Sequence, residues 1–347
     1  MDWESIDWSA LERLRAGFLA SRIQSDYWQS ESDLQSYDQT FAQRIGWKWD
    51  YVLRELTRLG WKAPGGEVLD WGCGSGVAGR AFVEHLGVAS VSRLRLWDRS
   101  ELAVRFASRR AAERFPGLAI EAQAPDQAAE TLVLSHVLTE LDEAQLEKLV
   151  DLAAQCTAVL WVEPGTHEAS RRLSAVRDRL VNRLFHVIAP CTHRGPCPML
   201  VAGNEAHWCH HFASPPAAVF RDSHWSRFAA LAGVDLRSLP VSFLVLDKRP
   251  SPQALGGALR IIGRPRVYKA HALLFGCGES GLQERRLSKR HFPGPFRQMK
   301  KGEVDPLQVW ECEKEEIVQW RALPGALAAE RHDDDSKDDH SGGAQDL

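Results

Sequence analysis

The sequence predicts an α/β protein built on a doubly wound parallel sheet. Two observations support this fold class. From Glu67 to Gly165, short apolar segments alternate with segments of helical periodicity, which is typical of a parallel sheet with helices on its faces. A glycine-rich turn, Gly72–Gly76, joins the first apolar segment to the next helix, at the edge where folds of this class bind ligands.

Each element follows from its local pattern. Residues 1–63 place apolar side chains at three- and four-residue spacing and are expected to be helical. The expected strands are 68–71, 93–97, 118–122, 131–135 and 158–162, with helices at 78–86, 100–115 and 143–154. Further on we expect a helix at 168–186, an irregular segment at 187–224, a helix at 225–232, and β-rich stretches at 241–247 and 267–275 of a small barrel or sheet.

The chain is therefore divided into five regions. These are an N-terminal helical region (1–63), a cofactor-binding Rossmann-like domain (64–186), a cysteine-rich region with a helix (187–239), a β-rich basic domain (240–323) and a disordered acidic tail (324–347).

Composition limits the class of protein. The chain has 347 residues and a net charge of −3. Apolar runs fall short of the ~20 residues that a membrane span needs, and the acidic N-terminus resembles neither a signal nor a transit peptide. We therefore expect a cytoplasmic protein without a membrane partner. The charge is uneven, because residues 284–301 are strongly basic and the tail is acidic, and such asymmetry is compatible with nucleic-acid binding.

The glycine loop has two acidic residues at informative positions. Asp70 ends the first strand two residues before Gly72, and Asp98 closes the second strand, where a carboxylate can bind ribose hydroxyls. The loop, with Gly74 and Gly76, has the form Asp-x-Gly-x-Gly-x-Gly, which resembles the class I methyltransferase motif rather than the dinucleotide form. The resemblance implies S-adenosylmethionine contacts by Asp70, Gly72, Gly74, Gly76 and Asp98.

The end of the fourth strand carries no recognised catalytic motif. Amino-methylating enzymes have an Asn/Asp-Pro-Pro-aromatic segment there and cytosine-C5 enzymes a Pro-Cys, and both are absent after Ser135. His136 is the candidate catalytic residue, as a base or a substrate ligand. Glu140 and Glu163 also fall near this edge. A protein that binds the cofactor without transferring its methyl group remains an alternative.

The seven cysteines are an odd number and do not suggest a disulfide framework. Cys191, Cys197 and Cys209 lie in a proline-rich segment, and Cys277 is a distant fourth. Zinc ribbons use close Cys-x₂₋₄-Cys pairs, which are missing, whereas four thiolates at wider spacing suit an iron–sulfur cluster. Zinc stays open as the alternative metal, with nearby histidines as alternative ligands.

Several segments within roughly residues 25–310 resemble one family, the mitochondrial ribosomal small-subunit methyltransferase-like proteins, which have bacterial relatives. The most specific segment is Ile188–Pro198. The other matching segments are Arg44, Asp70–Gly76, Ser135–Leu141, Glu163–Thr166, Ala169–Leu180, Trp208–Cys209, Arg264–His271 with Cys277, and Ser288–Arg290.

The resemblance implies a [4Fe–4S] cluster held by Cys191, Cys197, Cys209 and Cys277. It also implies a role in small-subunit assembly and translation on rRNA, and we add Ser135 to the expected cofactor contacts. Three functions remain open: an assembly factor that docks on rRNA through Arg264, Arg266, Lys269 and residues 285–301, an active rRNA methyltransferase, or a zinc-containing small-molecule methyltransferase. The sequence does not predict an oligomeric state.

Overall fold

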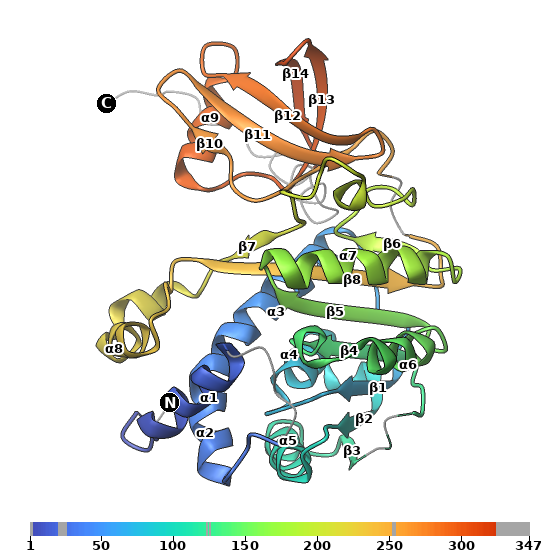
Figure 1. Ribbon diagram of the computed structural model, residues 1–347, viewed down its shortest axis with the longest axis vertical. Coiled ribbons are helices and arrows are strands. Elements are labelled where there is room, and N and C mark those ends of the chain that lie inside the picture. The colour runs from blue at the N-terminus through green and yellow to red at the C-terminus, as the bar shows by residue number, and fades with distance from the viewer. Residues whose placement is uncertain (1–2, 20–25, 123, 125, 252–254, 324–347) are drawn as a thin grey trace, which may run out of the picture.

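The structure is a computed structural model that describes residues 3–19, 26–122, 124, 126–251 and 255–323. The expected disordered tail at 324–347 lies outside these residues. The described chain forms one sheet of eight strands and a second sheet of six strands at its C-terminal end (Figure 1). No helix in this part of the chain is both long and apolar enough to cross a membrane.

The first sheet confirms the predicted fold class. Its strand order is β3-β2-β1-β4-β5-β8-β6, with β7 paired to β8. The five central strands pair in parallel, and β8 runs antiparallel to β5. The strands are β1 (Gly66–Trp71), β2 (Val91–Trp97), β3 (Ala119–Ala122), β4 (Thr131–Ser135), β5 (Ala158–Pro164), β6 (His186–Ala189), β7 (His211–Ala213) and β8 (Leu239–Asp247).

Helices cover both faces of this sheet, because its central strands are buried on both sides. Side chains of α3, α4 and α8 join one core cluster and those of α6 and α7 the other. The helices are α1 (Trp8–Leu19), α2 (Glu31–Gln39), α3 (Phe41–Arg58), α4 (Val77–Leu86), α5 (Glu101–Arg114), α6 (Glu143–Ala153), α7 (His167–Val181) and α8 (Ser223–Ala232), with short 3₁₀ helices at Val88–Ser90, Leu138–Glu140, Pro198–Leu200 and Ala217–Arg221.

Helix α3 reaches the end of β4 through Trp49. Its apolar stripe includes Val52, Leu53 and Leu56, all buried, at the spacing expected of an amphipathic helix. Trp49 is fully buried, and its indole N–H donates to Ser135 Oγ at 3.0 Å. This helix therefore has a fixed position over the end of β4.

The structure differs from the sequence-based expectation around β8. The stretch 241–247 was assigned to the β-rich C-terminal region, but it forms most of β8 and pairs with β5 over its length. Both faces of β8 are buried, and a continuous apolar run does not reveal which sheet it joins. The helix expected to reach residue 186 ends at Val181, because His186 begins β6.

The second sheet closes on itself, since β9 pairs with both β13 and β11. We call this closed sheet, with the helix packed against it, the C-terminal barrel. Residues of β11 alternate between buried and partly exposed, as expected for a strand with one face toward a core. The elements are β9 (Leu259–Ile261), β10 (Arg266–Val267), β11 (His271–Gly278), β12 (Gly281–Ser288), α9 (Pro293–Lys301), β13 (Leu307–Glu313) and β14 (Glu316–Ala322).

Candidate functional site

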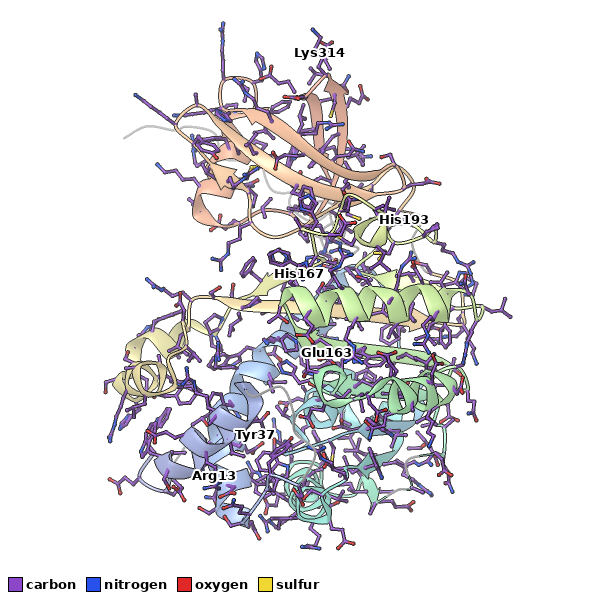
Figure 2. All side chains as sticks on the ribbon, in the orientation of Figure 1. Arg13, Tyr37, Glu163, His167, His193 and Lys314 are labelled. Carbon is purple, nitrogen blue, oxygen red and sulfur yellow. The ribbon has the colours of Figure 1, made fainter. Side chains whose placement is uncertain are left out.

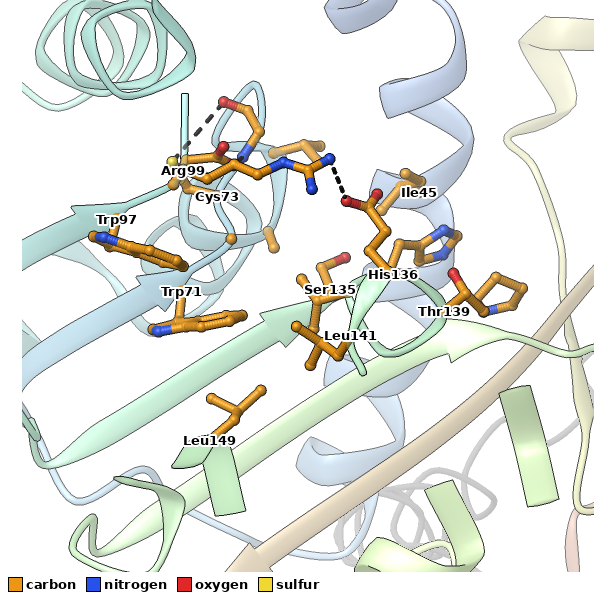
Figure 3. A pocket seen from close by; sticks show the side chains of 18 of the residues that line it. Ile45, Trp71, Cys73, Trp97, Arg99, Ser135, His136, Thr139, Leu141 and Leu149 are labelled. Atoms are coloured by element: carbon orange, nitrogen blue, oxygen red, sulfur yellow. Dashed lines mark hydrogen bonds and ion pairs between the residues drawn. The ribbon is translucent and has the colours of Figure 1, made fainter. Parts of the chain in front are cut away.

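A cavity of about 1080 Å³ lies at the carboxyl ends of β1, β2 and β4. Ligands of open α/β sheets bind at this edge. Helices α2, α3 and α6, the start of α7 and the segment around Tyr27 also contribute to its lining. Figure 3 shows Trp71 and Trp97 at one side of the cavity and Ser135 and His136 at the other.

The glycine loop lines the cavity through Gly72 and Gly74. Gly72 has φ +71°, and a Cβ on it would lie 2.5 Å from Val137 Cγ1. Gly74 has φ +52°, and a Cβ there would meet no atom within 4 Å, because this residue faces the open cavity. Gly76 has φ +79° and packs against Ala107 outside the cavity lining.

The two carboxylates of the motif have different positions. Asp98 lines the cavity, and its two oxygens accept the backbone N–H groups of Gly74 (2.8 Å) and Ser100 (2.9 Å). Asp70 is fully buried behind the loop, where Oδ2 accepts the Gly79 N–H at 2.8 Å and Oδ1 has no partner. Burial raises the pKa of Asp70 to about 7. Asp70 thus holds α4 against β1, and its expected cofactor contact remains a prediction.

Two tryptophans at the strand ends form an aromatic wall that the sequence analysis missed. The rings of Trp71 and Trp97 lie 4.4 Å apart between centroids and both line the cavity. Beside them, Arg99 forms an ion pair with Glu140 at 3.1 Å (Figure 3). The sequence signal that could have predicted this wall is the tryptophan beside the aspartate at the end of β1 and of β2. Flat aromatic faces of this kind stack with heterocyclic rings.

Ser135 and His136 stand where β4 ends, as expected from the sequence. Ser135 Oγ accepts from Trp49, so its own O–H is available to a ligand. His136 has φ +58°, which is uncommon for a residue with a side chain. Burial, with the charges of Lys48 and Arg44, lowers the pKa of His136 well below its ordinary value. The imidazole is therefore neutral near pH 7.

Lys48 and Arg44 approach His136 from α3. Lys48 is only 8% exposed, and its Nζ lies 3.4 Å from His136 Nε2. Burial and the charge of Arg44 lower the pKa of Lys48 to about 7. The sequence analysis included Arg44 in a resemblance but missed Lys48. The signal was a lysine in the apolar stripe of α3, three residues after Ile45 and four before Val52.

Glu163 at the end of β5 is a structural carboxylate at this edge. Its Oε1 accepts the backbone N–H groups of Val137 (3.1 Å) and Leu138 (2.9 Å) and the Trp161 indole N–H (2.7 Å). Burial raises its pKa to about 7. Glu163 thereby fixes the loop that follows β4 and presents His136.

The four candidate cysteines come from three segments and meet between the first sheet and the C-terminal barrel. Cys197, Cys209 and Cys277 share a small apolar cluster with Met199. Burial is the largest cause of the raised pKa of each of these three thiols, and the charge of Cys191 is the second. Because such an effect requires a short distance, all four cysteines are neighbours. The structure thus brings Cys277 of the barrel together with the three cysteines of the proline-rich segment.

Two buried arginines hold this region in place. Arg177 donates to the carbonyls of Gly195 (2.7 Å) and His193 (2.8 Å), so it ties α7 to the loop between Cys191 and Cys197. Figure 2 labels His193 in this loop, between the first sheet and the barrel. Arg260 of β9 donates Nε to the carbonyl of Pro190 at 2.8 Å. Nε of Arg177 and Nη2 of Arg260 are buried without a hydrogen-bond partner.

Among the described residues, no group of three or more His, Cys, Asp and Glu side chains is arranged to hold a metal ion. The mutual effects on the thiol pKa values show proximity all the same. The two findings are compatible, because the donors of a mononuclear site must touch one ion, whereas a cubane cluster separates its four thiolates more widely.

The C-terminal barrel has an exposed basic surface. Its cations are Arg264, Arg266, Lys269, Arg286, Lys289, Arg290, Arg297, Lys300 and Lys301, all exposed. Arg266 and Arg286 have carboxylate partners in Glu284 and Glu316. Tyr268, 48% exposed, lies among them and stacks on His271.

The parallel sheet, its antiparallel β8 and the glycine loop define a protein of the class I methyltransferase fold. A profile of the Rsm22 family, described as mitochondrial small ribosomal subunit Rsm22, matches residues 88–304, more than half of the chain. The protein belongs to the Rsm22 family. No curated protein matches it in a sequence comparison.

The solved structures that match this chain include methyltransferases. A putative RNA methyltransferase from Pyrococcus horikoshii is 12% identical, with a TM-score of 0.36, over 59% of this chain and 84% of that chain. Magnesium protoporphyrin IX methyltransferase from Synechocystis, with bound SAH, is 14% identical, with a TM-score of 0.37, over 70% of this chain and 94% of that chain.

Proposed function

We propose that the protein binds S-adenosylmethionine and a [4Fe–4S] cluster and supports assembly of the small ribosomal subunit. The observation that carries the proposal is the glycine loop, which faces a cavity at the carboxyl ends of β1, β2 and β4. Membership of the Rsm22 family supports the proposed role in the small ribosomal subunit, because the description of that family names the mitochondrial small ribosomal subunit.

The residues present fit the cofactor. Gly74 leaves room where a Cβ would stand, so its backbone can approach the ligand closely. Asp98 has lone pairs left after accepting two N–H groups and is suited to the ribose hydroxyls. Trp71 and Trp97 offer an aromatic face to the adenine ring. Ser135 can donate its hydroxyl hydrogen.

The donor set between the sheet and the barrel fits an iron–sulfur cluster. Four thiols are what a cubane cluster requires, and the unpartnered N–H groups of Arg177 and Arg260 can offset the negative charge of thiolates. When bound, the cluster would join the loop of Cys191 and Cys197 to Cys209 and to Cys277 of β11. Its contribution here is therefore structural crosslinking of the barrel to the first sheet.

The basic barrel surface provides the contact with rRNA in this proposal. Exposed arginines and lysines neutralise phosphates, and the exposed Tyr268 can stack with an unpaired base. Because phosphate contacts release counterions, binding should weaken steeply as salt rises. Replacing Lys300 and Lys301 with Gln should reduce the salt slope of binding to a single-stranded oligoribonucleotide by about 1.4, without changing S-adenosylmethionine affinity.

Active methyl transfer is a second candidate, favoured by the position of His136. S-adenosylmethionine supplies an electrophilic methyl group when bound. As a base nitrogen forms its bond to the methyl carbon, the sulfur–methyl bond would break and S-adenosylhomocysteine would leave. The neutral imidazole at the cavity wall can accept the proton that the nitrogen loses. Positioning of that nitrogen by the cavity supplies the rest of the acceleration.

One set of measurements on the full-length protein tests these functions. Anaerobically purified protein should contain about four irons, and a single zinc would contradict the cluster. Radiolabelled S-adenosylmethionine should bind to the wild type. The Gly74→Val variant should bind it more weakly, because the added side chain enters the cavity. Transfer of the label to small-subunit particles from a deletion strain, lost in His136→Ala, would establish catalysis. Binding without transfer assigns the assembly role alone.

A further inference from the structure

The wall of the cavity beside His136 carries two cations that have no anionic partner within the described chain. Arg44 and Lys48 both line the cavity. They are four residues apart on α3, so they lie on the same face of the helix, one turn apart. No ion pair within 4.0 Å involves either side chain among the described residues.

Their burial makes this arrangement costly. Lys48 is 8% exposed, and within the part of the chain that the structure describes its one hydrogen-bond contact is the imidazole of His136 at 3.4 Å. Nε of Arg44 is buried without a hydrogen-bond partner. A buried ammonium or guanidinium group is strongly disfavoured unless it is paired. Two like charges one turn apart destabilise the helix further.

The acidic side chains that act on these charges form no ion pair with them. Glu163 stabilises the Lys48 charge without an ion pair within 4.0 Å; its Oε1 accepts three N–H groups and its Oε2 is buried without a hydrogen-bond partner among the described residues. Asp235, whose charge raises the pKa of Arg44, is exposed and forms an ion pair with Arg237. A cavity wall with unpaired positive charge and low-dielectric surroundings attracts an anion.

We propose that Arg44 and Lys48 form an anion-binding subsite that receives one carboxylate or phosphate group of a ligand in the cavity. The carboxylate could come from the methionine part of the cofactor, and the phosphate from a nucleic-acid methyl acceptor or bound rRNA. The subsite rests on the proposed function, because its ligand is the cofactor or a molecule beside it. Lys48 Nζ lies 3.4 Å from His136 Nε2, so a group held by the subsite would lie beside the residues at the end of β4.

The test compares four variants with the wild type, all as full-length, cluster-containing preparations. Arg44→Met and Lys48→Met remove the charges, and Arg54→Met is the matched control, because Arg54 is an exposed arginine on the same helix. Lys48→Arg retains a cation at the same position and should rescue the effect of Lys48→Met. Thermal unfolding followed by circular dichroism verifies that each variant is folded.

Calorimetric titration with S-adenosylmethionine and with its decarboxylated analogue separates the two sources. If the subsite holds the cofactor, Arg44→Met and Lys48→Met weaken S-adenosylmethionine binding by about tenfold or more and leave the decarboxylated analogue unchanged. If it holds a phosphate, they leave both cofactors unchanged but abolish binding of inorganic phosphate to the cofactor-loaded protein.

The proposal would be overturned if Arg54→Met weakened binding as much as Arg44→Met does. It would also be overturned if Arg44→Met and Lys48→Met changed the binding of neither S-adenosylmethionine nor inorganic phosphate. Its failure is distinguishable from failure of the proposed function. Wild-type protein that binds S-adenosylmethionine while the variants behave normally refutes only the subsite. Wild-type protein that binds no S-adenosylmethionine refutes the cofactor assignment, and the phosphate titration then decides the subsite by itself.

Discussion

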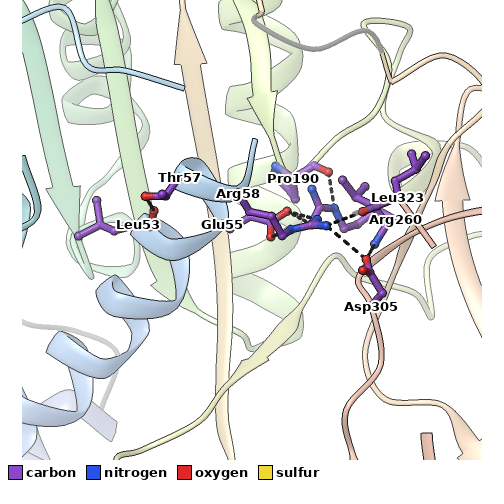
Figure 4. A network of polar contacts seen from close by, with 9 residues as sticks. Leu53, Glu55, Thr57, Arg58, Pro190, Arg260, Asp305 and Leu323 are labelled. Atoms are coloured by element: carbon purple, nitrogen blue, oxygen red, sulfur yellow. Dashed lines mark hydrogen bonds and ion pairs between the residues drawn. The ribbon is translucent and has the colours of Figure 1, made fainter. Parts of the chain in front are cut away.

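A buried ion pair connects α3 to the C-terminal barrel, and replacing Glu55 with Gln should destabilise the protein strongly. Glu55 and Arg260 are 5% and 1% exposed, and the carboxylate pairs with Arg260 and, at 2.9 Å, with Arg58. Arg58 continues the network to Asp305 at 3.3 Å (Figure 4). Because Glu55→Gln leaves the Arg260 charge buried and unpaired, the cost should be about 3–5 kcal/mol.

The pKa of Glu55 gives a second estimate of this energy. Burial raises the pKa, but the charges of Arg260 and Arg58 outweigh burial and hold it at about 2, below the ordinary value of 4.5. The difference corresponds to roughly 3 kcal/mol of stability. Since the folded-state pKa is the lower one, this contribution is complete above about pH 4.5 and is lost as the pH falls toward 2.

Urea unfolding of wild type and Glu55→Gln at pH 7 and at lower pH measures the effect. The matched control is Glu84→Gln, because Glu84 forms an ion pair with Arg114 whose side chains are 56% and 58% exposed, and such pairs contribute about 0–1 kcal/mol. A difference below about 1 kcal/mol for Glu55→Gln at pH 7, or a difference that does not shrink in acid, would refute the reasoning.

Three further outcomes are expected. Gly76→Ala should cost about 2 kcal/mol in urea unfolding and weaken S-adenosylmethionine binding, because φ is +79° and the new Cβ would lie 2.9 Å from Ala107 Cβ; unchanged stability would contradict the loop geometry. Burial raises the pKa of Asp70 above its ordinary value of 3.8 to about 7. Between these two values the folded state binds a proton that the unfolded state has lost, so the free energy of unfolding of the wild type should fall as the pH rises from about 4 to about 7. Asp70→Asn should remove up to roughly 4 kcal/mol of that fall, and pH-dependent unfolding that is identical in both proteins would exclude this role. Arg177→Met should lower the iron content of anaerobically purified protein by about half or more, because the loop with Cys191 loses two carbonyl contacts; full iron occupancy would show that Arg177 does not support the site.

Much of the first sheet could be predicted because its signals are local. Alternation of apolar and amphipathic segments places β1, β2, β4 and β5 close to their observed bounds, since the periodicity reflects burial of each element by itself. The Asp-x-Gly-x-Gly-x-Gly spacing placed Gly72 and Gly74 in the cavity wall for the same reason: a tight turn after a strand is a local feature.

Long-range pairing was not available from the same signals. β8 is an apolar run whose paired residues in β5 lie 77 to 89 residues earlier in the chain, from Pro164–Val241 to Ala158–Asp247. Lys48 interrupts an apolar stripe, but only the packing of α3 over β4 brings it to His136. Neither relation leaves a trace in the spacing of neighbouring residues.

By itself, the sequence determined the fold class, the glycine loop, the family resemblance that the Rsm22 profile confirms, and four cysteines as a ligand prediction. The tertiary structure decided that Asp70 supports α4 from behind the loop, that Cys277 of the barrel approaches Cys191, and that two unpaired cations face the cavity. The physical reason is that turns and periodicity depend on near neighbours, whereas burial, charge pairing and cavity walls depend on which distant segments pack together.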